Sequence, residues 1–294
     1  MNNLIYNRKI GASILRFLMG FLIFKDFVIY FANRKYLFGN QGIVSYQTYK
    51  DIINFYKLNW LYVDFTEVNN VNIFCFLGIS FGFLFMLGIL QRFSVVLLSA
   101  LLFLFKIRNI YILDGADNVI SVILPFYLFI ETQSLSSKYE FLKHKIYKRT
   151  STISNILSVY FSYGIMIQIC IVYFFSGLHK LEGKMWRDGT ALYYILNSDD
   201  FSPTKFNSFF TSSIILVKLS TWFTIIFQLL FSIFILIKKT RCITIFIGIL
   251  LHTGIFFLMK IDNFSFIMIS CYALFFTDNQ YASVYNKLKI KYAT

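Results

Sequence analysis

The sequence predicts an all-α fold, a polytopic bundle of about eight membrane-spanning helices. Hydrophobic residues make up 57% of the 294 residues and charged residues only 14%, a balance too apolar for a soluble domain. Several stretches approach the roughly 20 apolar residues that cross a bilayer. These runs are continuous and do not alternate with polar residues, which favours helices over strands, and a helix satisfies its own backbone hydrogen bonds in lipid.

The apolar runs predict eight spans, at residues 10–31, 71–90, 93–110, 119–130, 153–178, 214–237, 243–258 and 264–276. The first run contains charged residues and no small-residue cleavage site follows it, so we expect it to remain as a span. Two prolines, 14 glycines and no internal repeat favour one compact domain. We therefore expect a cytoplasmic N-terminus at 1–9, a transmembrane domain at 10–276 and a basic cytoplasmic tail at 277–294.

The distribution of Lys and Arg predicts the orientation. Segments on the side of the N-terminus carry more of them, which places both termini in the cytoplasm of a cell membrane. The formal net charge of +14 then acts mainly on anionic lipids of the inner leaflet. The cations are divided among short loops, so no nucleic-acid partner is expected. Residues 33–60, 114–117 and 176–194 share the outer side.

The cysteines are expected to be buried thiols. Cys75, Cys170, Cys242 and Cys271 all lie in apolar runs, without C-x-x-C spacing and without a companion histidine pattern. The sequence therefore predicts no metal site.

The outer end of the fifth span carries a candidate site. Helical geometry places Tyr173, Ser176 and Lys180 on one stripe, with His179 on a neighbouring one. Lys180 has two interpretations. It is either a lysine that snorkels to the membrane edge, or a base whose neutral amine is favoured by partial removal from water and by nearby cations.

The segment after Lys180 predicts a cover for that site. Trp186 fits an interfacial anchor. Asp188 is expected to cap a short extracytoplasmic interfacial helix that starts at residue 189 or 190 and carries Tyr193 and Tyr194. Such a helix could roof a cavity that has Lys180 at its floor.

Four other polar residues in or near spans also have two interpretations. Arg16 needs an acidic or carbonyl partner, and it is either a structural ion pair or part of a site. His252 fits a helix–helix hydrogen bond or a functional group. Asp114 and Asp117 fit an N-cap of the fourth span, or a carboxylate that faces Lys180 or Arg16.

The segment SGLHKLEGKMWRDGTALYY resembles the signature of the HTTM (horizontally transferred transmembrane) domain. Vitamin K-dependent gamma-carboxylases and the bacterial sporulation-delaying protein B group share this domain. Weaker resemblances lie at Arg16, Gly20 and Asp26 of the first span, in YLFGNQGIVSY, and at His252, Phe264, Ser265 and Met268. Together they cover about residues 10–276.

The resemblance implies that Lys180 is the base that deprotonates a vitamin K-type hydroquinone, so a quinone or hydroquinone is the expected cofactor. With Lys180, the expected catalytic residues are His179, Asp117 and His252. The expected cofactor-binding residues are Tyr173, Ser176, Trp186, Tyr193, Tyr194 and Arg16.

The chain also departs from the carboxylases. Asp117 and Asn118 stand where those enzymes have a histidine, and the chain ends soon after the last span, without a β-rich extracytoplasmic domain. Carboxylation of protein glutamate is therefore not expected. The alternative to a quinol-linked enzyme is a non-catalytic accessory protein for the maturation or export of a secreted peptide toxin. In that case its partner is the peptide or a small membrane protein.

Overall fold

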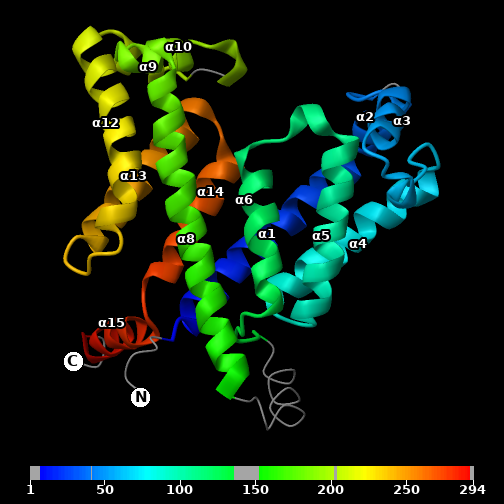
Figure 1. Cartoon of the computed structure of the whole chain (residues 1–294), viewed down its shortest axis with the longest axis horizontal. Coiled ribbons are helices and arrows are strands. Elements are labelled where there is room, and N and C mark those ends of the chain that lie inside the picture. The colour runs from blue at the N-terminus through cyan, green and yellow to red at the C-terminus, as the bar shows by residue number, and fades with distance from the viewer. Residues whose placement is uncertain (1–6, 41, 136–151, 202–203, 292–294) are drawn as a thin grey trace. The chain divides into compact units, whose positions relative to one another are not determined.

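The computed structural model describes residues 7–40, 42–135, 152–201 and 204–291 (Figure 1). The predicted basic group at 138–149 lies outside these residues. The all-α class is confirmed, since the described residues form helices and contain no strand. Each predicted span falls on a helix: α1 (Lys9–Ala32), α4 (Val68–Leu87), α5 (Gln91–Arg108), α6 (Gly115–Ile123), α8 (Thr152–Glu182), α12 (Ile214–Phe234), α13 (Arg241–Met259) and α14 (Asp262–Cys271).

Four of these helices, α4, α8, α12 and α13, are long and apolar enough to cross a membrane. Helices α1 and α5 have a similar length but contain several charged side chains. Helices α6 and α14 are shorter, and each continues as a 3-10 turn, η3 (Leu124–Leu128) and η5 (Tyr272–Phe275). The sequence pattern therefore located all eight helices, but it overestimated the regularity of the fourth and the eighth.

The chain divides into two compact units. Unit 1 contains residues 1–162 and 276–294, and unit 2 contains residues 163–275, with α8 running from one into the other. Unit 1 also holds α2 (Arg34–Phe38), α3 (Tyr46–Phe55), η1 (Asn59–Leu61), η2 (Ile110–Ile112) and α15 (Asp278–Lys291). The remaining elements of unit 2 are α9 (Lys184–Arg187), α10 (Ala191–Leu196), η4 (Asp199–Phe201) and α11 (Asn207–Thr211).

Glycines let α1 and α4 pack closely in unit 1. A Cβ added to Gly20 would overlap the backbone of Met86, and one added to Gly82 would lie 3.1 Å from the backbone of Phe24. The residue numbers rise along one helix as they fall along the other, so the two helices are antiparallel. Small residues at helix contacts are the usual way for membrane helices to approach, because lipid offers no hydrophobic driving force between them.

The last helix of unit 1 holds the start of the first one. The carboxylate of Asp278 accepts hydrogen bonds from the backbone N–H groups of Lys9, at 3.2 Å, and Ile10, at 2.8 Å. It thereby satisfies two of the N–H groups that the first turn of α1 leaves without a helical partner. The predicted basic tail is therefore largely a helix, α15, whose first residue caps α1. The start of α15 therefore lies beside the start of α1 in unit 1.

In unit 2 a predicted cap is wrong. Asp188 does not cap the short helix that carries Tyr193 and Tyr194; it ends α9. The next residue, Gly189, has φ +75°, a left-handed conformation that disfavours residues with a Cβ, and it turns the chain before α10 starts after Thr190. The predicted helix exists, but a glycine turn sets its start and not an aspartate cap.

We expect the α9–α10 region to face outside and the α12–α13 turn to face the cytoplasm. Asp199 and Lys239 are exposed positions in these two regions. In a variant whose four native cysteines are Ala, Asp199→Cys should react with a membrane-impermeant maleimide in intact cells. Lys239→Cys should react only after the cells are permeabilised. The reverse pattern would invert the predicted orientation.

Candidate functional site

One face of α8 in unit 2 carries several of the predicted site residues. Tyr173, Gly177 and Lys180 follow one another at helical spacings of four and three residues, so they share a stripe. Gly177 contacts α12, because a Cβ added there would lie 2.9 Å from the side chain of Leu229. On this stripe Tyr173 is buried in unit 2, and Lys180 is half-buried near the end of the helix.

Lys180 lies between a carbonyl group and an aromatic ring. Its Nζ donates a hydrogen bond of 3.4 Å to the Ser176 backbone oxygen and lies 5.0 Å from the ring centre of Trp186. Within the described part of the chain, no carboxylate pairs with it. Lys180 is thus half-buried, and its amine contacts an aromatic ring and a carbonyl group in place of a carboxylate.

Deeper along α8, Tyr173 is the centre of a buried polar network. Its hydroxyl forms a 2.6 Å hydrogen bond with Nε2 of His252 on α13, and a second hydrogen bond with the hydroxyl of Tyr272 in η5. Phe231 of α12 stacks on the Tyr173 ring, with 3.8 Å between ring centres. The structure therefore brings together two predicted residues, Tyr173 and His252, and adds Tyr272.

A glycine of α13, Gly248, leaves the space that Tyr272 occupies in this network. A Cβ added to Gly248 would overlap the Tyr272 hydroxyl, so only glycine leaves room for it on that face of α13. The other ring nitrogen of His252, Nδ1, is buried and has no hydrogen-bond partner among the described residues. A buried polar atom without a partner is costly, so this nitrogen can receive one further polar group.

Lys180 and the network share a helix face but do not touch. Lys180 lies seven positions after Tyr173 on α8, which corresponds to roughly 10 Å along the helix axis. The two centres are thus about two turns apart, with Gly177 and Ser176 between them.

Other predicted residues of unit 2 lie on its surface. The side chain of His179 is 71% exposed, and its Nδ1 lies 3.5 Å from Oε2 of Glu182. Both side chains lie outside the stripe that carries Lys180. Tyr193 and Tyr194 are exposed on α10. The structure therefore does not gather these three residues around Lys180, and their roles stay predictions.

Arg16 and Asp117 belong to unit 1, and both have local structural contacts there. The buried Arg16 donates a 3.0 Å hydrogen bond to the Gln133 backbone oxygen and packs over Gly88, where a Cβ would overlap the guanidinium. Asp117 forms a capping box with Asp114, because the carboxylate of each residue accepts a hydrogen bond from the backbone N–H of the other. The N-cap interpretation of the DGAD turn is thus confirmed. A ligand role for either residue stays a prediction.

Sequence reasoning missed Arg108, the last residue of α5. Its buried guanidinium donates to three backbone oxygens of the first loop, at 2.7 Å to Val44, 2.9 Å to Phe38 and 3.2 Å to Gly39. The ring centre of Tyr49 lies 5.7 Å from the guanidinium carbon of Arg108. Burial raises the pKa of the Tyr49 phenol, so this side chain is neutral at physiological pH and is no counter-ion. One arginine therefore holds the backbone at Phe38, Gly39 and Val44.

Helices of this length and hydropathy define a polytopic membrane protein, with a buried network and a covered lysine in one of its units. The chain belongs to the HTTM domain family, whose model matches residues 8–279. This match confirms the resemblance that was predicted from the sequence over about residues 10–276.

Two relatives come from Bacillus subtilis (strain 168). The uncharacterized protein YitO is 26% identical over 173 residues, which cover 58% of this chain and 55% of YitO. The sporulation-delaying protein SdpB is 27% identical over 169 residues, which cover 55% of this chain and 51% of SdpB. The chain thus spans about half the length of these relatives. No solved structure matches it.

Proposed function

We propose that the protein is a membrane-embedded enzyme in which Lys180 acts as a base on a lipophilic hydroquinone. The observation that carries this proposal is the setting of Lys180, half-buried beneath Trp186 and without a carboxylate partner in the described residues. A structural cation in a membrane protein is usually paired or reaches for water. An amine that is covered and has no counter-ion is instead suited to accept a proton at Nζ.

The residues of unit 2 fit an aromatic, weakly polar ligand. Trp186 offers a ring surface beside the amine, and the Ser176 carbonyl orients Nζ. Nδ1 of His252 has no described partner, so it can make one more hydrogen bond to a ligand or to water. When bound, a hydroquinone would supply an acidic hydroxyl and redox chemistry toward oxygen. Lys180 would hold the proton.

The proposal is tested by the molecules that accompany the purified protein. After extraction in mild detergent, mass spectrometry of the organic extract should find a quinone at about one molecule per chain. In addition, an added naphthoquinone should quench the fluorescence of Trp186, and Trp186→Phe should lose that part of the quenching while Trp222→Phe keeps it. A protein that carries no quinone and shows no quenching of Trp186 would contradict the proposal.

The similarity to the sporulation-delaying protein SdpB favours a second function. Here the protein would be an accessory factor of a bacterial antimicrobial peptide system, and it would bind a secreted peptide or a small membrane partner without catalysis. The same mass spectrometry separates the two functions, because this one requires a bound peptide in place of a quinone.

A further inference from the structure

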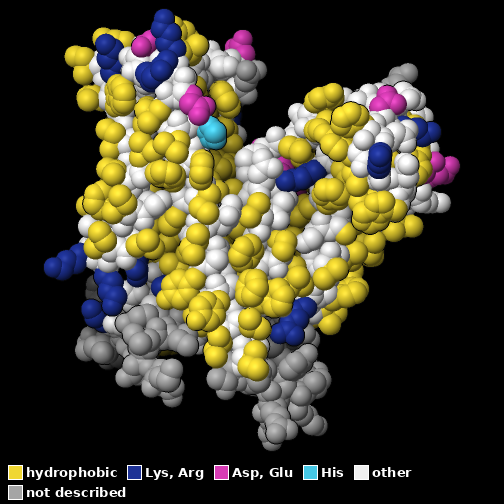
Figure 2. Space-filling view, in the orientation of Figure 1, with side chains coloured by type: hydrophobic (Ala, Val, Ile, Leu, Met, Phe, Trp, Pro, Cys, Tyr) yellow, Lys and Arg dark blue, Asp and Glu magenta, His cyan; other side chains and the backbone are white. Residues whose placement is uncertain are grey.

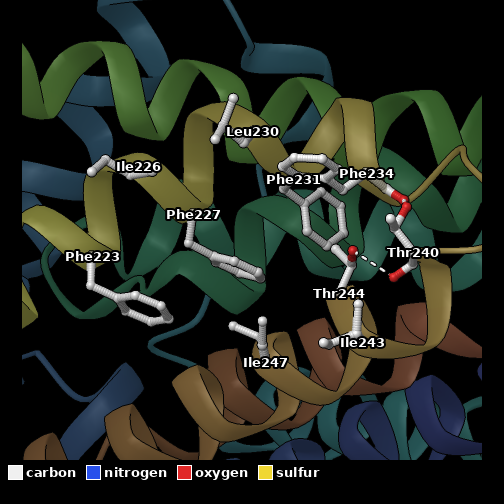
Figure 3. Close-up of a pocket in the computed structure, with 10 residues that line it drawn as sticks. All are labelled: Phe223, Ile226, Phe227, Leu230, Phe231, Phe234, Thr240, Ile243, Thr244 and Ile247. Atoms are coloured by element: carbon white, nitrogen blue, oxygen red, sulfur yellow. Dashed lines mark hydrogen bonds between the residues drawn. The ribbon is translucent and has the colours of Figure 1, made fainter.

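A groove of about 290 Å³ lies between α12 and α13 in unit 2 (Figure 3). Four aromatic side chains of α12 and two aliphatic side chains of α13 form most of its walls: Phe223, Phe227, Phe231, Phe234, Ile243 and Ile247. Pockets that bury a whole drug-sized molecule measure about 300–1,000 Å³. This groove is therefore suited to one chain of a larger molecule.

The groove offers a ligand almost no hydrogen bonds. Its two threonines already use their hydroxyl protons. Thr240 donates to the Phe234 oxygen at 2.6 Å. Thr244 donates to the Thr240 oxygen at 3.0 Å (Figure 3). Both helices that form it are long and apolar enough to span a membrane. In that region the surrounding molecules are lipids, so the occupant that matches the groove is an acyl chain.

The end of the groove is cationic. Thr240, one of its lining residues, directly follows the exposed Lys238 and Lys239 in the α12–α13 turn. Figure 2 shows Lys and Arg side chains gathered where α12 turns into α13. The next cation, Arg241, is engaged with the turn itself through a 3.1 Å hydrogen bond to the Ile235 oxygen. Residues 201–261 contain no Asp or Glu, so this helical hairpin has a net positive charge.

We propose that this groove is a binding site for an anionic phospholipid. One acyl chain lies between α12 and α13, and the lipid phosphate lies at Lys238 and Lys239. The apolar walls select a hydrocarbon chain and the two lysines select a negative headgroup. In the predicted orientation this turn is cytoplasmic, where anionic lipids are enriched. The site is independent of the function proposed for Lys180.

Native mass spectrometry of the purified full chain tests this site. The protein is delipidated and then offered phosphatidylglycerol or phosphatidylcholine with identical acyl chains. We expect phosphatidylglycerol to bind with a preference of roughly 30-fold, the effect of two lysines near a phosphate. Lys238→Gln with Lys239→Gln should remove most of this preference. Lys218→Gln, which removes one exposed charge at the opposite end of α12, should keep it.

A second variant tests the groove itself. Ile243 lines the groove and is 59% exposed, so Ile243→Trp should fill part of the space without disturbing the core. It should weaken the retention of both lipids while the gel-filtration profile stays unchanged. Equal binding of the two lipids by the unmodified protein, an unchanged preference in the double glutamine variant, or a quinone in place of the lipid would each overturn the proposal.

Discussion

Replacing Arg108 by Met is expected to destabilise unit 1 by at least about 3 kcal/mol. The guanidinium donates to the backbone oxygens of Phe38, Gly39 and Val44, and the arginine is fully buried. Met retains much of the volume but donates no hydrogen bond, so these oxygens would lose their partner away from water. A buried acceptor without a partner costs about 1–3 kcal/mol. The measurement is thermal unfolding of the purified protein in detergent.

Arg92→Met is the matched control, because Arg92 lies in the first turn of the same helix and is exposed. Its effect should stay within about 0.5 kcal/mol, as for most surface substitutions. Arg108→Lys should fall between the two, since one ammonium cannot reproduce the planar fork of donors. If Arg108→Met unfolds like the unmodified protein, the loop at 38–44 does not depend on this side chain.

The helices could be predicted because membrane spans are read from composition. An apolar run long enough to cross a bilayer has few alternatives to a helix, so the helices α1, α4, α8, α12 and α13 lie close to their predicted places. The 176–194 segment was recognisable for a similar local reason. Its lysine, tryptophan and glycines are close in sequence, and the turn at Gly183 between α8 and α9 keeps Lys180 and Trp186 close in space.

The contacts that hold these helices together could not be predicted from the sequence. The contacting residues are either far apart in the chain or are contacted through backbone atoms, which no residue type marks. Tyr272, which bonds to Tyr173, is 99 residues away from it in the sequence. Asp278, which caps α1, is 268 residues away from Ile10. Arg108 binds backbone oxygens, which every residue has. A charge at the end of an apolar helix therefore indicates that some partner exists, but not which one.

Gly248 offers the one local hint of the buried network. It lies four residues before His252, on the same face of α13, and therefore marks a place where another side chain enters. Tyr272 occupies that place. The two hydrogen bonds of Tyr173 then fix α8, α13 and η5 to one another within unit 2, which gives the face that carries Lys180 a rigid support.

Replacing Lys180 by either Met or Arg is expected to abolish activity. The readout is the oxygen uptake of membranes that contain the protein after addition of a naphthohydroquinone. Loss of a general base typically slows a reaction by about 10²–10⁴-fold. Met keeps the apolar part of the side chain that packs in unit 2, so this variant should still accumulate in the membrane in normal amounts. Arg keeps the charge but its guanidinium stays protonated and cannot accept a proton.

The two variants together separate a base from a membrane anchor. An anchoring lysine needs only a cation at the membrane edge, so Arg would replace it and Met would lower the amount of inserted protein. Lys184→Met is the control, because Lys184 is a neighbouring exposed lysine on α9 and should leave oxygen uptake unchanged. Normal oxygen uptake in Lys180→Arg would make Lys180 an anchor, and Trp186 would then cover a structural cation.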